Sequence, residues 1–200
     1  MLLDKLKNFN IILGSQSPRR QFLLKELGIN FTLKANNNIH EAYPDDINHE
    51  EIPVYLAKMK SDLIRDKIET KDILITADTI VYYKNQVINK PVDYNDAIHI
   101  LKKLSGNMHE VITGVCITTL LNQVCFKSKT KVYFKELNED EIRYYVKTYN
   151  PYDKAGAYGI QEWIGYIAIE KIEGSFFNVM GLPIEKLYTE LDKFITDNGK

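Results

Sequence analysis

Cysteine is scarce in this sequence: Cys116 and Cys125 are the two cysteines among its 200 residues. Both lie in apolar, strand-like stretches, so we expect no disulfide framework, and a reducing cytoplasm is the default location. No run approaches 18 apolar residues, so the sequence predicts no membrane-spanning helix and no membrane partner. Residues 1–10 alternate leucine with charged residues and lack the apolar core of a signal peptide.

Net charge is also nearly absent. The 26 Lys and Arg residues against 27 Asp and Glu residues leave a charge of -1, which argues against a nucleic-acid binder. The hydrophobic share of 44% and the charged share of 26% are those of an ordinary globular protein. Because no repeat, low-complexity tract or linker interrupts the chain, we expect residues 1–200 to form a single domain.

Strand-like and helix-like segments alternate along the chain, and two apparent hairpins break a pure βαβ rhythm. We therefore expect an α/β fold with a mixed twisted sheet, flanking helices and two lobes around a central cleft. The expected strands are 11–14, 73–83 (interrupted at 77–79, with a turn at 84–85), 111–121, 124–134 and 163–172. The expected helices begin near Ser17 (apolar face Phe22, Leu23, Leu24, Leu27), Pro53 (stripe Leu56, Met59, Lys60, Leu63), Ala97, Asn138 and Pro183.

Arg19 and Arg20 lie in the first turn of an expected helix, where the helix dipole disfavours cations by roughly 0.3–1 kcal/mol each. With Ser15 and Ser17 in the same turn, they form a group of donors suited to an oxyanion, most naturally phosphate. The competing interpretation is a pair of arginines that reach solvent or meet carboxylates elsewhere. The combination of strand, serine turn and arginine pair favours phosphate modestly.

Asp78 stands inside the apolar run 73–81, where a carboxylate costs free energy unless a metal, a cation or several donors compensate it. A hydrogen-bonded residue that ends the strand explains it equally well. Lys60 lies on the apolar stripe of its helix, and taken alone it is best explained by a stem that covers apolar surface while its head reaches water. Glu41, in a polar loop, and Lys90, before Pro91, carry almost no signal in isolation.

The segment 153–161 is rich in small residues and ends in Gln161, whose amide could read the edge of a nucleobase. An ordinary mobile loop is the competing interpretation. The sequence contains no Walker A motif and no G-x-G-x-x-G after a strand. Its four histidines show no metal-ligand spacing, so we expect no zinc site.

Taken together, these stretches resemble the Maf family of nucleoside triphosphate pyrophosphatases over nearly the whole chain. The stretches that carry the resemblance are 13–20 (LGSQSPRR), Glu41, 56–60 (LAKMK), 77–79 (ADT), Lys90-Pro91, Ser105-Gly106, 113–115 (TGV), 153–161 (DKAGAYGIQ) and 178–183 (NVMGLP). The resemblance implies a two-lobed fold like that of Maf and inosine-triphosphatase-like proteins. It also implies a house-cleaning enzyme that converts a nucleoside triphosphate to the monophosphate and pyrophosphate, with Mg²⁺ or Mn²⁺ and often as a homodimer.

By this resemblance, Asp78 is the general base, and Ser15, Arg20, Glu41, Lys60 and Lys90 are partners of the phosphates and the metal. We assign Glu41 and Asp78 to the metal, because hard divalent cations prefer carboxylate oxygens.

Arg19, Thr79 and Gln161 match the branch that prefers dTTP and UTP rather than the branch that prefers 7-methyl-GTP. The sequence departs from the family pattern at Ser61 and at 162–164, which leaves base preference more open than reaction type. A 7-methyl-GTP pyrophosphatase and a non-catalytic nucleotide-binding regulator of cell division stay as alternatives.

Overall fold

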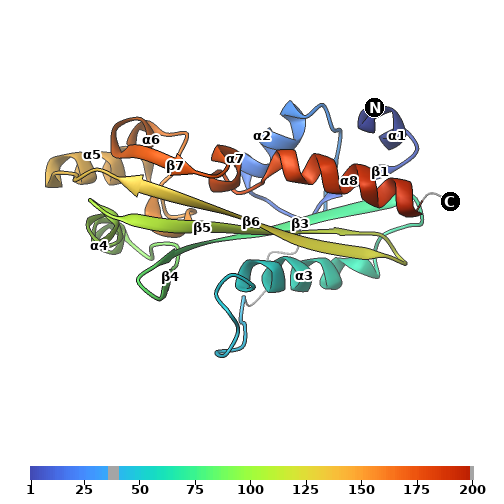
Figure 1. The fold of residues 1–200 in the computed structure, drawn as a ribbon, viewed down its shortest axis with the longest axis horizontal. Helices are drawn as coiled ribbons and strands as arrows, with labels where there is room; N and C mark the ends of the chain where they lie inside the picture. The colour runs from blue at the N-terminus through green and yellow to red at the C-terminus, as the bar shows by residue number, and fades with distance from the viewer. Residues whose placement is uncertain (36–40, 199–200) are drawn as a thin grey trace. The chain divides into compact units, whose positions relative to one another are not determined.

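The computed structural model describes residues 1–35 and 41–198 (Figure 1). Within them, no helix combines the length and apolar character needed to cross a bilayer. The elements in chain order are α1 (Leu2–Leu6), β1 (Asn10–Leu13), α2 (Pro18–Glu26), β2 (Thr32–Leu33), α3 (Ile52–Arg65), β3 (Asp72–Tyr83), β4 (Gln86–Ile88), α4 (Tyr94–Leu104), β5 (Met108–Thr118), β6 (Gln123–Phe134), α5 (Glu139–Tyr149), the 3₁₀ turn η1 (Ala155–Ala157), α6 (Trp163–Ala168), β7 (Ile169–Glu173), α7 (Phe176–Val179) and α8 (Ile184–Asn198).

The strands of the described residues form a mixed sheet of seven strands in the order β2-β1-β3-β5-β6-β7, with β4 paired to β3. β1 is parallel to β2 and β3, whereas β4 and β7 are antiparallel to their neighbours. The predicted turn after β3 is confirmed: Lys84 and Asn85 have φ values of 45° and 63°, as a two-residue hairpin turn requires. The predicted mixed sheet with flanking helices is therefore confirmed.

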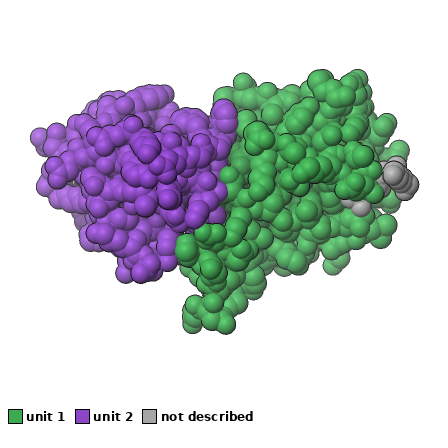
Figure 2. Space-filling model, in the orientation of Figure 1, with its two compact units in different colours: residues 1–78, 113–128, 181–200 green, residues 79–112, 129–180 purple. Residues whose placement is uncertain are grey.

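The chain divides into two compact units (Figure 2). Unit 1 comprises residues 1–78, 113–128 and 181–200, and unit 2 comprises residues 79–112 and 129–180. The strands β3, β5 and β6 each contribute part of their length to each unit. The predicted division into two lobes is confirmed, while the predicted cleft stays a prediction.

Unit 1 has helices on both faces of its strands: α3 covers one face, and α2 and α8 lie on the other (Figure 1). Ile64 on α3 belongs to a buried apolar cluster with Ile12 and Leu74 from the strands. The start of α3 lies directly against β5, because a Cβ added at Gly114 would lie 2.3 Å from the Pro53 backbone. A glycine at this position therefore lets the helix approach the strand closely.

Unit 2 packs α4 against α5. The predicted start of α5 is confirmed, because the Asn138 side chain accepts from the Glu141 N–H and the Glu141 side chain accepts from the Asn138 N–H. The helix buries Ile142, Tyr145 and Val146, which recur at the i, i+3, i+4 spacing of one helix face.

Some expectations about local structure are wrong. Residues 163–168 form α6 rather than a strand, with Ile164 and Ala168 buried at helical i, i+4 spacing. β3 runs through residues 77–79 without interruption. Phe22 and Leu63 are exposed by 54% and 47%, because α2 buries Leu23 and Leu24 and α3 turns its 57, 61 and 64 positions inward.

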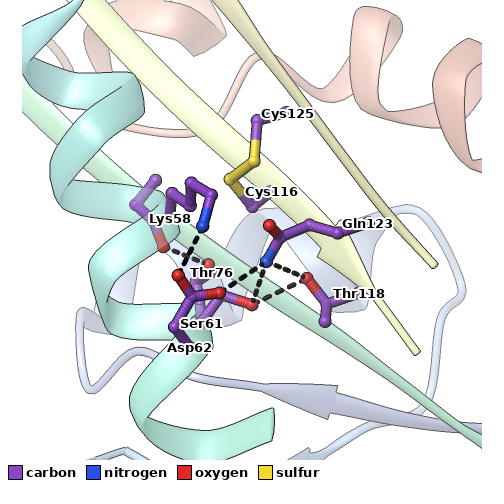
Figure 3. The surroundings of a disulfide bond; sticks show 9 residues. Lys58, Ser61, Asp62, Thr76, Cys116, Thr118, Gln123 and Cys125 are labelled. Carbon is purple, nitrogen blue, oxygen red and sulfur yellow. Dashed lines mark hydrogen bonds and ion pairs between the residues drawn. A yellow bond between two sulfur atoms is a disulfide. The ribbon is translucent and has the colours of Figure 1, made fainter. Parts of the chain in front are cut away.

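The cysteines are also corrected by the structure, since Cys116 on β5 and Cys125 on β6 form a disulfide (Figure 3). Their Cα atoms are 4.1 Å apart, which is the close approach of residues that face each other across two antiparallel strands. Counting cysteines misses this pairing because it depends on hairpin register. The cysteine argument for a reducing compartment therefore no longer holds, and the cytoplasmic location stays a prediction.

His109 is buried in the core of unit 2 among aromatic rings. Its Nε2 lies 2.8 Å from the Tyr158 hydroxyl, and its ring meets those of Phe134 and Tyr158 edge to face at 5.0 and 5.4 Å. Its Nδ1 has no hydrogen-bond partner within the described residues. Burial lowers the pKa of His109 to about 3, so the folded chain holds this imidazole neutral.

We predict that this histidine makes unit 2 sensitive to acid. The unfolded chain protonates it near its ordinary pKa of about 6.5, whereas the folded chain resists protonation down to about 3. Between these values the unfolded state binds one more proton. The free energy of unfolding should therefore fall by about 1.4 kcal/mol for each unit by which the pH is lowered. Urea unfolding of wild type and His109→Gln between pH 7 and pH 4 measures this, and the variant should lose that part of the slope.

The matched control is His99→Gln, which removes an exposed histidine from α4. It should leave the wild-type slope in place. Equal slopes in wild type and His109→Gln would contradict the prediction.

A second prediction concerns the disulfide, which closes a short loop with a sequence separation of 9. Reduction should lower the free energy of unfolding by about 2–3 kcal/mol, because the open chain has more conformational freedom when unfolded. Urea unfolding with and without dithiothreitol measures the loss. The Cys116→Ala/Cys125→Ala variant is the control and should not respond to the reductant. A wild-type chain that gives the same curve in both conditions would show the prediction to be wrong.

Candidate active site

Parallel pairing of β1 and β3 brings the Ser15 turn and Asp78 to the same edge of the sheet. Leu13 pairs with Ile75, so two residues further along each strand Ser15 lies level with Ala77. Ser15 and Asp78 are each 8% exposed. The N-cap position of α2 is Ser17, as predicted, and its N–H donates to Ser15 Oγ at 3.3 Å. The sequence-predicted turn and carboxylate are therefore neighbours within unit 1.

Arg20 forms hydrogen bonds with three segments at this edge. Its Nη1 donates to Ser15 Oγ at 3.1 Å and to the Ala77 carbonyl at 2.8 Å, and its Nε donates to the Gly181 carbonyl at 2.8 Å. Burial is the largest influence on the pKa of Arg20 and lowers it, whereas the charge of Asp78 opposes this shift. Carbonyl oxygens and a carboxylate thus compensate this arginine at the start of α2.

Lys60 bridges two carboxylates. Its Nζ lies 2.5 Å from Asp78 Oδ1 and 2.6 Å from Glu41 Oε1. The Lys60 and Asp78 side chains are 13% and 11% exposed, whereas Glu41 is 42% exposed. The interpretation that the Lys60 head only reaches water is therefore wrong. His40, which precedes Glu41 in the chain, lies outside the described residues.

The next residue on α3 anchors the helix that carries Lys60 (Figure 3). Ser61 Oγ lies 2.7 Å from Thr118 Oγ1 on β5, and Gln123 Nε2 on β6 donates to Ser61 Oγ, Thr118 Oγ1 and Asp62 Oδ1. These bonds fix α3 against the strand pair that the disulfide joins. Ser61, a departure from the family pattern, therefore has a structural role beside Lys60.

Two cations and two carboxylates thus gather at one edge of unit 1, with Arg19 close enough for its charge to lower the pKa of Arg20. The oxygens of Glu41 and Asp78 converge on a single ammonium group. Because Mg²⁺ and Mn²⁺ prefer a few carboxylate oxygens completed by phosphate and water, these donors fit such a cation. The arrangement suits binding of a polyanion through cations and a metal.

The other three predicted site residues belong to unit 2. Thr79 follows Asp78 on β3 and is half-buried, Lys90 is exposed after β4, and Gln161 is half-buried before α6. The chain next to Lys90 contacts the small-residue segment, because Gly156 N–H donates to the Asn89 carbonyl at 3.3 Å. Unit 2 therefore holds Lys90 and Gln161 in segments that touch each other.

A cavity of about 290 Å³ lies elsewhere in unit 1, near the turn that joins β5 and β6. Its lining is mostly apolar, with Thr70, Thr119 and Asn122 as the polar members. Because the described residues that line this cavity include no charged side chain, it is unsuited to a triphosphate, and they include none of the predicted site residues.

The sequence of this chain matches a known protein family. Residues 10–194 match the family described as Maf-like protein. The chain belongs to the Maf family. A protein named dTTP/UTP pyrophosphatase from Bacteroides fragilis (strain YCH46) is 50% identical over 190 residues, covering 95% of this chain and 98% of its own.

A protein of the same name from Porphyromonas gingivalis (strain W83) is 49% identical over 199 residues, covering 98% of this chain and 100% of its own. The solved structure of the Staphylococcus aureus Ham1 protein aligns over 92% of this chain and 98% of its own, at 14% identity and a TM-score of 0.48. The family membership rests on the sequence matches.

Sequence reasoning missed the backbone partners of this Maf-family site. The Ala77 and Gly181 carbonyls hold Arg20, and any residue type offers a carbonyl. It also missed the contacts of Tyr145, Lys154 and Glu162 beside the segment that carries Gln161. The signal for these was the departure at 162–164, where the family pattern typically has a glycine-containing stretch.

Proposed function

We propose that this chain hydrolyses dTTP and UTP to the nucleoside monophosphate and pyrophosphate, as a house-cleaning nucleotide pyrophosphatase. The observation that carries the proposal is the group in unit 1 in which Lys60 bridges Glu41 and Asp78 beside Arg20. The relatives named dTTP/UTP pyrophosphatase, which align over nearly their full lengths, support it. We further propose that residues 1–200 act as one domain, in the cytoplasm, as a homodimer.

The first task of such a site is to hold the triphosphate, which brings about four negative charges. We assign this to Ser15, Arg19, Arg20, Lys60 and Lys90. Arginine suits phosphate because its planar fork can donate two parallel hydrogen bonds. Arg20 is already hydrogen-bonded to the Ala77 and Gly181 carbonyls. Its side chain therefore loses little conformational freedom when substrate binds.

The second task is to hold a divalent cation, Mg²⁺ or Mn²⁺, for which we propose Glu41 and Asp78 as ligands. When bound, such a cation supplies charge neutralisation of the phosphates and a lower pKa for a nearby water. With Glu41 and Asp78 as ligands of a cation, the Lys60 ammonium group would be left to donate to a phosphate oxygen. The same residue thus holds the carboxylates in place before substrate arrives and neutralises substrate charge afterwards.

The third task is proton transfer. Water attacks the α-phosphorus, a bond forms between the water oxygen and that phosphorus, and the bond to the bridging oxygen of the β-phosphate breaks. Pyrophosphate leaves with this electron pair, and the cations that surround it stabilise its charge. We assign the proton of the attacking water to Asp78, because its buried carboxylate stands beside the phosphate-binding turn.

The fourth task is recognition of the base, which we assign to Arg19, Thr79 and Gln161. The carboxamide of Gln161 offers both an acceptor and donors, as the edge of uracil or thymine requires. The share of identity with dTTP/UTP pyrophosphatases supports this branch over 7-methyl-GTP.

A panel of dTTP, UTP, CTP and 7-methyl-GTP with detection of pyrophosphate tests the proposed function. We expect dTTP and UTP to be hydrolysed at least about tenfold more efficiently than the other two, and turnover to stop in excess EDTA. Highest turnover of 7-methyl-GTP would assign the chain to the other branch. Tight nucleotide binding without pyrophosphate release would favour the non-catalytic regulator, and orthophosphate as a product would move the attack to the γ-phosphorus.

We predict that Asp78→Asn lowers kcat by about 10²–10⁴-fold, the usual contribution of a general base, while dTTP still binds. The matched control is Asp72→Asn at the start of β3, six residues before Asp78. Asp72 is also 8% exposed, and its oxygens accept from Asn10 Nδ2 and the Glu69 N–H. It should keep wild-type kcat, because it lies away from the phosphate turn. Steady-state kinetics with pyrophosphate detection compares the two, and an Asp78→Asn enzyme with unchanged kcat would remove this residue from the chemistry.

A further inference from the structure

We propose that Tyr145, Glu162 and Lys154 form a buried clamp that positions Gln161 to read the substrate base. The clamp lies wholly within unit 2, and the three side chains come from α5, the start of α6 and the segment before η1. This inference rests on the proposed function, because it gives a role to residues that touch the base-reading side chain rather than the substrate.

Tyr145 is the centre of the clamp. Its side chain is fully buried on α5, its hydroxyl accepts from the Gly159 N–H at 3.0 Å, and the same hydroxyl donates to Glu162 Oε2. A phenol can do both at once because it has one donor and a lone pair that accepts. Burial, followed by the bond to Glu162, raises the pKa of Tyr145, so the hydroxyl keeps its proton and its role as donor.

The Glu162 carboxylate has little access to water, and two partners compensate its lost hydration. Its Oε2 accepts from Tyr145, and its Oε1 lies 3.2 Å from Lys154 Nζ. The side chains of Glu162 and Lys154 are 19% and 9% exposed, and Lys154 Nζ also lies 2.7 Å from Asp153 Oδ1. A charge with so little access to water needs such partners to stay in place, so the position of Glu162 is fixed by the two side chains.

The backbone on both sides of Gln161 is held by the same clamp. The Glu162 N–H donates to the Gly159 carbonyl at 3.0 Å, which closes a tight turn over residues 159–162. Gly159 is then bound to Tyr145 through its N–H, and Glu162 through its carboxylate. One tyrosine hydroxyl therefore fixes the first and last residues of the turn that presents Gln161.

The turn has no spare room. A Cβ added at Gly159 would lie 2.7 Å from the Glu162 carboxyl carbon, and one added at Gly165 would lie 1.8 Å from the Ile160 carbonyl oxygen. The Tyr166 hydroxyl also donates to the Gln161 carbonyl at 2.9 Å. The backbone that carries Gln161 is thus packed from several directions, which is the condition for a side chain to read hydrogen bonds selectively.

The Gln161 side chain has a buried acceptor that a substrate base could satisfy. Its Oε1 is buried and has no hydrogen-bond partner among residues 1–35 and 41–198. A buried acceptor without a partner favours a ligand that brings a donor. Uracil and thymine carry an N–H at position 3, whereas cytosine has an acceptor there. The clamp therefore holds Gln161 in a state that selects uracil-like over cytosine-like bases.

The test compares Tyr145→Phe with the matched control Tyr149→Phe, whose ring stacks on that of Tyr145 one turn along α5 at 5.1 Å. We expect Tyr145→Phe to lower the ratio of kcat/KM for UTP over CTP by about tenfold, mainly through a higher KM for UTP. The kcat with UTP should stay within about threefold of wild type, because the clamp does not touch the phosphates. Tyr149→Phe should keep the wild-type ratio.

A double-mutant cycle with Gln161→Ala separates positioning from general stability. If Tyr145 acts through Gln161, then Tyr145→Phe should leave the UTP to CTP ratio unchanged when Gln161 is already alanine. Glu162→Gln is the second variant: it keeps an acceptor for Tyr145 but loses the ion pair with Lys154, so it should lower the ratio in wild type and not in Gln161→Ala.

The outcomes divide cleanly. The clamp would be overturned if Tyr145→Phe lowered the UTP to CTP ratio of kcat/KM as much in the Gln161→Ala background as in wild type. It would also be overturned if Tyr145→Phe and Glu162→Gln both kept the wild-type ratio, whatever their melting temperatures. A wild-type chain that releases pyrophosphate from neither UTP nor CTP would instead overturn the proposed function, and with it the role given to Gln161. The two failures are distinguished before any variant is compared.

Discussion

The ammonium group of Lys60 is the contact on which the candidate site depends. Glu41 and Asp78 would repel each other if their carboxylates came together without a cation, and burial would strengthen that repulsion. Lys60 contacts both at 2.5–2.6 Å, so the two acids can stand side by side before any substrate or metal arrives. The rest of unit 1 supports this contact: the parallel strands place Asp78, and the bonds of Ser61 to the β5–β6 pair place the helix.

Unit 2 contains a second group of compensated charges with a different purpose. Lys154 and Glu162 lie in a mostly buried setting and are joined to a protonated tyrosine. Such groups rarely add much net stability, because desolvation offsets most of their attraction. Such groups instead fix the positions of side chains, because a fully partnered charge has few alternative positions. In both units, then, an ion pair with little access to water fixes the position of a side chain: Asp78 in unit 1, and Glu162 of the proposed clamp in unit 2.

Local signals in the sequence were enough to predict several elements. The capping pair Asn138 and Glu141 and the Lys84-Asn85 turn depend on contacts within four residues, and both are confirmed. The errors arise where tertiary structure decides. The segment 163–168 is apolar enough for a strand or a helix, and the cysteine pair depends on which residues face each other across a hairpin. The residue types of the site were readable, but the carbonyls that hold Arg20 and the tyrosine behind Gln161 were not, because those contacts join distant parts of the chain.

The strand β3 passes from unit 1 to unit 2 between Asp78 and Thr79. Neighbouring residues of a strand point to opposite faces, so a single inserted or deleted residue would exchange the faces of everything beyond it. Such a change before Asp78 would turn its carboxylate away from Lys60. The number of residues between Asp72 and Tyr83 therefore decides which face of the sheet each side chain of this strand occupies.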